Sequence, residues 1–129
     1  MGMVSFEAFR AMDGTPVYLQ IINYIKRGAI AGTIRDGDEL PSRRVLSALL
    51  GINPNTVQKA FHMLEEAHLM ESRTGAKSCM TLPPDTLDAL RREVLSDELR
   101  AMARTLRQLG ISKEEALRLI EQAWKEEEG

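Results

Sequence analysis

Apolar residues recur at helical spacing along much of the chain. In the segment from about residue 16 to 31 they form a single stripe, which consists of Val17, Tyr18, Ile21, Ile22, Ile25, Ala29 and Ile30. Thr15 followed by Pro16 predicts the start of this helix, with Thr15 as the N-cap and Pro16 at the first helical position. Gly32 predicts its end, and Gly28 inside it predicts a close backbone contact.

Two further helices follow in close succession. Ser42 is a favourable N-cap for residues 43–50, and Gly51 stands where a helix end favours a left-handed residue. Asn53 predicts a second cap, followed by a proline at the first position of a helix over residues 54–67. Because so few residues separate them, the two helices are expected to cross. The residues expected to be buried between them are Leu46, Leu49, Leu50, Ile52, Val57, Phe61 and Leu64.

A small hairpin is predicted after these helices, from residues 69–73 and 77–82, with Gly75 at its tip. The pair Pro83-Pro84 breaks the pattern and predicts a boundary between a region at 1–82 and one at 83–129. The second region shows helical spacing up to Gly110 and then a capping box that opens a last helix. Its apolar positions are Leu87, Leu90, Val94, Leu95, Leu99, Met102, Leu106, Leu109, Ala116, Leu117, Ile120, Ala123 and Trp124.

Length and composition limit the class of protein. The 129 residues suffice for one compact domain with an accessory element. There is no apolar run long enough to cross a bilayer and no signal-peptide pattern at the N-terminus, so we expect a cytoplasmic protein that does not enter a membrane. The single cysteine, Cys79, excludes an internal disulfide.

The net charge of −2 hides a local basic segment. Between Glu39 and Glu65 the chain contains Arg43, Arg44 and Lys59 and no acidic residue. The order of helix, helix, turn, helix and hairpin predicts a mainly α fold, a winged helix-turn-helix whose third helix enters the major groove. DNA carries a charge about every 1.7 Å, so a docking surface without carboxylates avoids repulsion by phosphates.

The third predicted helix begins with side chains suited to reading bases. Asn55 and Gln58 can pair with adenine, Thr56 can serve a phosphate or a thymine methyl group, and Lys59 can reach guanine or phosphate. Asn53 has two readings that the residues leave equally open, a helix cap or a DNA contact. Together with the acid-free run, these side chains favour DNA binding.

Two motifs resemble the DNA-binding domain of the GntR family of bacterial transcription regulators. They are Leu-Pro-Ser-x-Arg at residues 40–44 and Asn-Pro-Asn-Thr-Val at residues 53–57, within a similarity over roughly residues 13 to 82. The short C-terminal region is similar to the YtrA subfamily, in which a helical pair serves dimerisation. Because apolar helices need a cover, which is either the winged domain or a second copy, we expect a homodimer through residues 84–127.

The resemblance implies roles for particular residues. Arg44 matches an operator-contacting arginine, and Gly75 matches a glycine at the tip of the wing. The wing departs from a Gly-Lys-Gly-like pattern, so a contact by Lys77 is less secure, and Arg43 stands at a variable position expected to face solvent or phosphate. The predicted DNA-binding residues are Ser42, Arg43, Arg44, Asn53, Asn55, Thr56, Gln58, Lys59, Arg73, Gly75 and Lys77.

The expected function is therefore a sequence-specific dimeric regulator, more often a repressor in this family, that binds a double-stranded DNA operator. The resemblance suggests transporter genes as targets and leaves open a small-molecule effector, with the groove between the two regions as its default place. No catalytic residue, cofactor or metal is expected, because Cys79, His62 and His68 do not form a plausible site. The alternative is a winged helix that binds a protein and not DNA.

Overall fold

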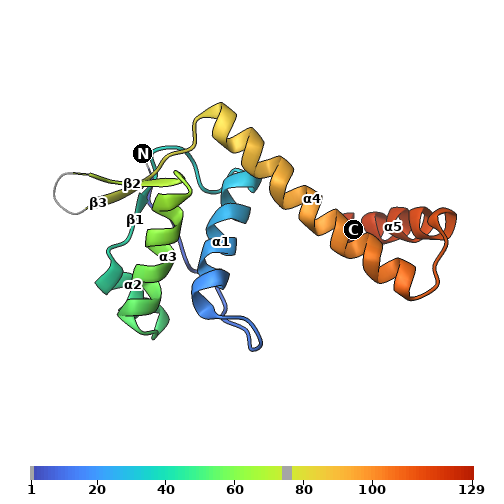
Figure 1. Ribbon diagram of the computed structural model, residues 1–129, viewed down its shortest axis with the longest axis horizontal. Coiled ribbons are helices and arrows are strands. Elements are labelled where there is room, and N and C mark those ends of the chain that lie inside the picture. The colour runs from blue at the N-terminus through green and yellow to red at the C-terminus, as the bar shows by residue number, and fades with distance from the viewer. Residues whose placement is uncertain (1, 74–76) are drawn as a thin grey trace. The chain divides into compact units, whose positions relative to one another are not determined.

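The computed structural model describes residues 2–73 and 77–129, and the chain divides into two compact units, Met1–Arg91 and Arg92–Gly129. Within the first unit, three helices and a small sheet form a winged helix, which confirms the predicted fold class (Figure 1). The first unit continues past Pro83-Pro84 into the first turns of α4, where Leu90 is buried. The elements of the chain are α1 (Val17–Ala31), β1 (Glu39–Leu40), α2 (Arg43–Leu50), α3 (Pro54–Glu66), β2 (Met70–Arg73), β3 (Lys77–Met80), α4 (Pro84–Gln108) and α5 (Lys113–Glu128).

Helix α1 starts one residue later than predicted. Pro16 is the N-cap, with φ −55° and ψ 137°, and Thr15 makes no side-chain cap. The reason is the loop before it: the Gln20 amide donates to the carbonyl oxygens of Met12 and Thr15 and accepts from the Met12 N–H. These bonds hold the chain in a loop up to Pro16. At the other end Gly32 is the left-handed C-cap, as predicted.

Gly28 makes the close contact that its place inside α1 predicts. A Cβ at this position would lie 2.6 Å from Cδ1 of Ile34 and 2.9 Å from its Cγ1. The chain turns back after Gly32, so that the N–H groups of Thr33 and Ile34 both donate to the Gly28 carbonyl. The missing side chain therefore lets Ile34 pack against α1, where it is buried.

Local capping residues define the two helices of the helix-turn-helix. The Ser42 hydroxyl accepts from the Val45 N–H at 3.1 Å, and Gly51 ends α2 in the left-handed region at φ 65°. The Asn53 Oδ1 accepts from the Asn55 N–H at 2.8 Å at the start of α3. All three assignments confirm the predictions.

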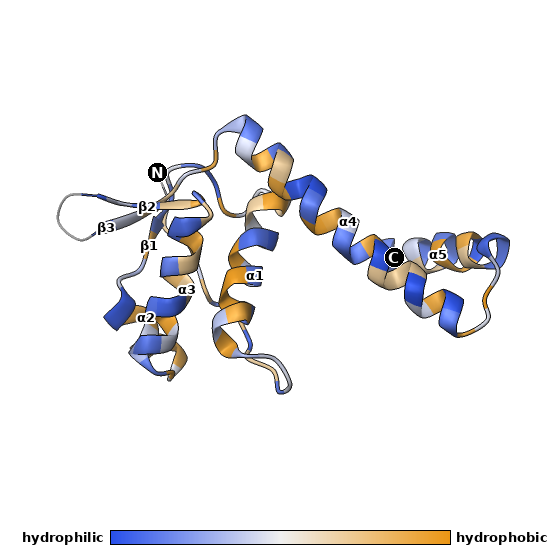
Figure 2. Ribbon diagram, in the orientation of Figure 1, coloured by the Kyte–Doolittle hydropathy of each residue, from blue (hydrophilic) through white to orange (hydrophobic). Residues whose placement is uncertain are grey.

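The core of the first unit lies between α1, α2 and α3, whose hydrophobic faces turn toward one another in Figure 2. Leu46, Val57 and Phe61 are buried there, but the prediction for Leu49 is wrong, because its side chain is 69% exposed. A helix as short as α2 presents only the stripe around Leu46 to α3, and Leu49 lies on the neighbouring face. Leu50 and Ile52 are half-buried rather than fully enclosed.

The wing is a three-stranded antiparallel sheet in the order β1-β3-β2. The hairpin of β2 and β3 was predicted, with Met70 opposite Met80 and Arg73 opposite Lys77. Strand β1, which was expected to be only an extended lead into α2, adds Glu39 opposite Cys79. The N-terminal segment joins its outer edge, where the Val4 N–H donates to the Glu39 carbonyl at 2.8 Å.

The second unit contains most of α4 and all of α5. Ser112 accepts from the Glu115 N–H at 3.2 Å, which confirms the predicted start of the last helix. No residue of α5 is buried, and Trp124 is 69% exposed. Among the described residues, no helix is long and apolar enough to cross a membrane.

Candidate nucleic-acid interface

One face of α3 is polar and free of carboxylates over its first two turns. Asn55, Gln58 and Lys59 are exposed, and Thr56 is half-buried at the edge of this face. The opposite face packs into the core through Val57, Ala60, Phe61 and Leu64. Because the core fixes the rotation of the helix, the residues predicted to read bases project together to solvent.

The N-terminus of α3 is capped by Asn53, whose backbone carbonyl also accepts from the N–H groups of Thr56 and Val57. Asn53 uses its Oδ1 to accept from the Asn55 N–H, so the capping interpretation is confirmed for this atom. Pro54 has no N–H, and no acidic residue lies in the first turn. The positive end of the helix dipole is thus unopposed by a local carboxylate, which suits a phosphate.

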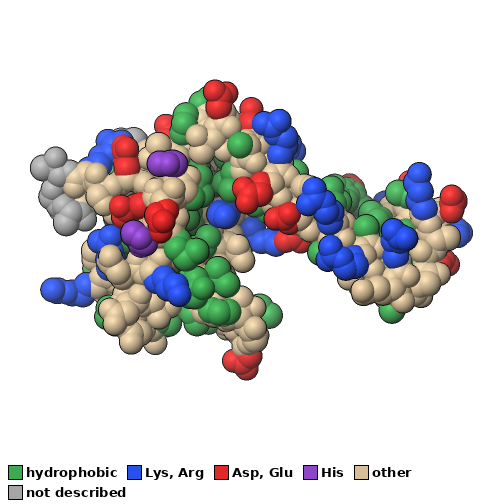
Figure 3. All heavy atoms as spheres, viewed as in Figure 1, with side chains coloured by type: hydrophobic (Ala, Val, Ile, Leu, Met, Phe, Trp, Pro, Cys, Tyr) green, Lys and Arg blue, Asp and Glu red, His purple; other side chains and the backbone are tan. Residues whose placement is uncertain are grey.

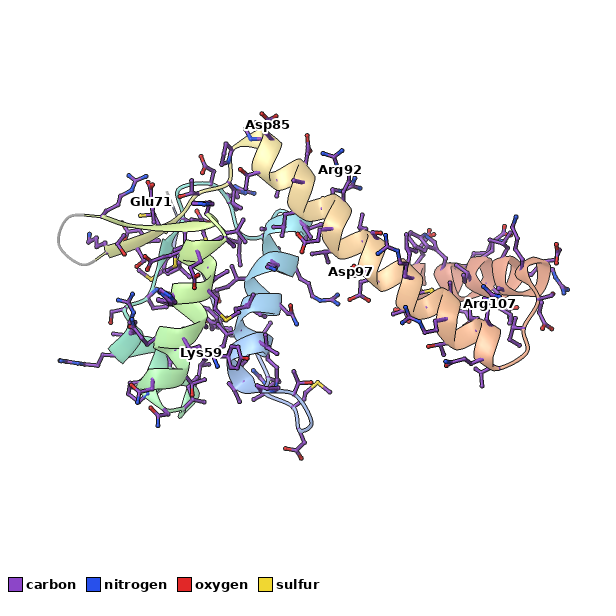
Figure 4. All side chains as sticks on the ribbon, in the orientation of Figure 1. Lys59, Glu71, Asp85, Arg92, Asp97 and Arg107 are labelled. Atoms are coloured by element: carbon purple, nitrogen blue, oxygen red, sulfur yellow. The ribbon has the colours of Figure 1, made fainter. Side chains whose placement is uncertain are left out.

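Lys59 is held by an aromatic ring of α1. Its Nζ lies 4.0 Å from the ring centroid of Tyr18, within the range of a cation–π contact, and Figure 4 shows Lys59 on the part of α3 that faces α1. The sequence pattern placed Tyr18 only in the apolar stripe of its helix. Here it also directs the ammonium group on the predicted recognition surface.

The two arginines of α2 have different surroundings. Arg44 is exposed, as expected for a DNA contact. Arg43 is half-buried between α2 and α3, where its Nη2 lies 3.4 Å from Oε1 of Glu65 and its guanidinium lies 5.6 Å from the ring centroid of Phe61. Arg43 therefore turns partly inward, because an acid and an aromatic ring in α3 attract it, and its contact with phosphate remains a prediction.

A buried serine fixes the turn between α2 and α3. The Ser47 hydroxyl donates to the Ile52 carbonyl at 2.5 Å, and the Ile52 N–H donates to the Ser47 carbonyl at 3.1 Å. Ser47 is not among the residues predicted from the sequence to be important. The signal available was a serine next to the buried Leu46 on a short helix, close before the turn.

The wing carries two of the predicted cations. Lys77 lies 3.9 Å from Glu39, and Arg73 lies 3.2 Å from Glu71, and all four side chains reach solvent. These exposed ion pairs are weak, so phosphate can compete for either cation. Gly75, the predicted wing tip, lies outside the described residues.

Acidic residues gather at the other end of α3. Glu65 and Glu66 occupy its last turn, and His62 lies 2.9 Å from Glu66. Figure 3 shows red and purple side chains together on this part of the first unit. The carboxylate-free surface on α3 is consequently limited to its N-terminal half, since carboxylates at the other end would repel phosphates.

Comparison with known proteins identifies this architecture. The profile described as "Bacterial regulatory proteins, gntR family" matches residues 17–77. The HTH-type transcriptional regulator Rv1152 of Mycobacterium tuberculosis is 30% identical over 107 residues, which cover 83% of this chain and 84% of that protein. The chain belongs to the GntR family. Its HTH-containing relatives are transcriptional regulators rather than enzymes.

Two further relatives are similar to this chain over different lengths. The HTH-type transcriptional repressor YtrA of Bacillus subtilis is 41% identical over 63 residues, which cover 49% of this chain and 48% of that protein. A solved GntR family transcriptional regulator from Listeria monocytogenes has a TM-score of 0.80 and 28% identity, covering 87% of this chain and 98% of that one. The Listeria similarity therefore extends well beyond the helix-turn-helix.

The family assignment explains the site as a DNA-binding helix-turn-helix. The profile match runs from the start of α1 to the first residue of β3, so it includes the two motifs at residues 40–44 and 53–57. Within the part of the chain that the structure describes, no cluster of His, Cys, Asp and Glu could hold a metal ion.

Proposed function

We propose that this GntR-family regulator is a dimeric repressor that occludes a promoter by binding a near-palindromic operator. One observation carries the proposal: Asn55, Gln58 and Lys59 project from the start of α3 on a surface without carboxylates, and Arg44 is exposed on α2. Amides, a cation and a helix N-terminus are the groups that read base edges and hold phosphates.

The roles within each half-site follow from the surroundings of each side chain. Asn55 and Gln58 are exposed amides on the groove-facing side and contact bases. Thr56, Lys59 and the α3 N-terminus take phosphates or neighbouring base edges. The N-terminus of α2, which Ser42 caps, holds the phosphate backbone together with Arg44. The wing cations Arg73 and Lys77 reach the flanking phosphates.

The second unit supports dimerisation. An apolar groove of about 630 Å³ lies between α4 and α5 and is lined by Leu99, Leu106, Leu117 and Ile120 among others. The helices leave large apolar side chains open to solvent, and Figure 2 shows hydrophobic positions recurring along both helices. A helical pair with such a groove needs a cover, and a second copy related by a twofold axis matches a two-half-site operator.

The direction of regulation is proposed from a relative. YtrA of Bacillus subtilis is a transcriptional repressor, and it is 41% identical to this chain over 63 residues. The sequence resemblance adds transporter genes as the expected targets. A bound dimer would then exclude RNA polymerase from the promoter.

The experiment is fluorescence anisotropy with full-length protein and the DNA upstream of its own gene, between 50 and 200 mM salt. We expect tight, salt-dependent binding. Arg44→Ala should lower the slope of log K against log salt by about 1.8, because each half-site loses one phosphate contact worth roughly 0.9. Asn55→Ala should weaken binding by about 1–3 kcal/mol at each half-site.

Arg91→Ala serves as the matched control, since it removes one exposed cation from the first unit outside the recognition surface. It should leave the affinity for the upstream DNA unchanged. Affinity equal to that for random DNA, with all three variants indistinguishable from the wild type, would contradict operator reading and favour the protein-binding winged helix.

A further inference from the structure

Three arginines form a basic ridge on the C-terminal half of α4. Arg100, Arg104 and Arg107 are four and three residues apart, so they lie on one face of the helix. There is no acidic residue from 99 to 108, whereas residues 84–98 contain five. In Figure 4 the labelled Asp85 and Asp97 mark the acidic part of α4 and Arg107 marks the basic part.

The ridge is open to a partner. All three arginines are exposed, and they line a shallow groove together with Ala103 and Gln108. Arg100 lies 3.7 Å from Asp97 in a surface pair. In the described part of the chain, Arg104 and Arg107 have no acidic group within ion-pair distance, which leaves two free cations side by side.

The complementary charge lies at the end of α5. Its last eight residues include Glu121 and the run Glu126 to Glu128, against a single cation, Lys125. Lys125 pairs with Glu121 along the same helix at 3.8 Å. The three carboxylates of the final run are exposed.

One chain cannot bring these charges together. Leu99 and Ile120 line the same apolar groove, so they lie at about the same level of the helical pair. Arg104 lies five residues after Leu99, toward the turn that joins α4 to α5. Glu127 lies seven residues after Ile120, away from that turn, because the two helices run in opposite directions. At 1.5 Å per residue the two charges are roughly 18 Å apart along the axis.

We propose that Arg104 and Arg107 of one protomer pair with the acidic C-terminal turn of α5 from a second copy. This contact rests on the dimer proposed above, and it fixes how the two protomers are aligned along their helices. A twofold axis across α4 near Leu99 places the end of the partner's α5 beside residues 104 to 107, which supplies both copies of the contact at once.

The neighbouring surface selects protein over DNA as the occupant. Arg107 lines both the ridge and the apolar groove between α4 and α5. A phosphate backbone would neutralise the arginines and leave that groove in water, whereas a partner helix with an apolar stripe and an acidic end satisfies both. The charged residues therefore set the orientation of the two protomers, and the apolar groove supplies the surface area that the dimer buries.

The test is a pair of charge reversals in the full-length protein, Arg104→Glu/Arg107→Glu and Glu127→Lys/Glu128→Lys, with dimer dissociation constants from sedimentation equilibrium. Each variant alone places like charges together and should raise the constant at least tenfold. An equimolar mixture should form a heterodimer about as tight as the wild type, because both contacts then join opposite charges. Recovery in the mixture also shows that both variants fold.

Arg10→Glu/Arg35→Glu makes the same change in charge at exposed positions of the first unit, away from α4 and α5 in the chain, and should leave the dissociation constant within about threefold of the wild-type value. A wild-type dimer that neither reversal weakens would overturn the ridge contact and leave the dimer standing. A wild-type monomer would overturn both proposals. Unchanged dimerisation with a reduced salt dependence of DNA binding would assign the ridge to the DNA backbone and refute the contact.

Discussion

Replacement of Arg43 by alanine should cost stability rather than DNA contacts. Arg43 and Glu65 are 35% and 34% exposed, so their ion pair contributes about 0.5 kcal/mol after screening by solvent. The contact with the Phe61 ring contributes another 0.5–1 kcal/mol, and the aliphatic stem covers part of the α2–α3 interface. The free energy of unfolding should therefore fall by about 1–2 kcal/mol.

The salt dependence of DNA binding separates this role from a phosphate contact. Urea unfolding gives the stability of each variant, and anisotropy in a salt series gives its slope. Arg43→Ala should keep the slope of the wild type, whereas Arg44→Ala should lower it with little change in stability. Arg43→Met is the control that retains the stem, and it should recover part of the stability.

The opposite pattern would refute a structural role for Arg43. If Arg43→Ala lowered the slope as much as Arg44→Ala and left the urea midpoint unchanged, the guanidinium would have to leave Glu65 and bind phosphate in the complex. The ion pair seen here would then contribute nothing to the stability of the helix crossing.

Three smaller predictions concern the scaffold, each measured by urea unfolding. His68→Gly should stabilise the protein by about 0.5–1 kcal/mol, because His68 has φ 62° at the end of α3, whereas Ala67→Gly at φ −80° should destabilise it. Gly28→Val should cost about 1–3 kcal/mol through overlap with Ile34, while the exposed control Ala31→Val should cost less than 1 kcal/mol. Ser47→Ala should cost about 0.5–1.5 kcal/mol, since the part-buried Ile52 carbonyl loses its hydroxyl donor, and an unchanged midpoint would contradict that role.

The interface was largely predictable because its signals are local. The caps at Ser42 and Asn53 and the glycine at 51 define α2 and α3, and the apolar positions of α3 decide which side faces the core. Once that side is fixed, the solvent side must carry Asn55, Gln58 and Lys59. Their contacts with DNA remain a prediction.

What local signals could not decide are the contacts between segments distant in sequence. Arg43 meets Glu65 across 22 residues, and Lys59 meets Tyr18 across a helix interface. Arginines, glutamates, lysines and tyrosines are also common on exposed surfaces, so the residue types alone do not reveal these contacts. The exposed position of Leu49 has the same origin, because only the crossing of α2 and α3 determines which leucines are covered.

The sequence by itself determined the helices, most of their ends, the hairpin and the acid-free surface, because caps, glycines and periodicity act within a few residues. The tertiary structure alone decided that β1 and the N-terminal segment extend the wing, that Ser47 locks the turn and that Arg43 turns inward. Each of these depends on hydrogen bonds or charges brought together by packing, and their free energies are too small to mark a sequence pattern.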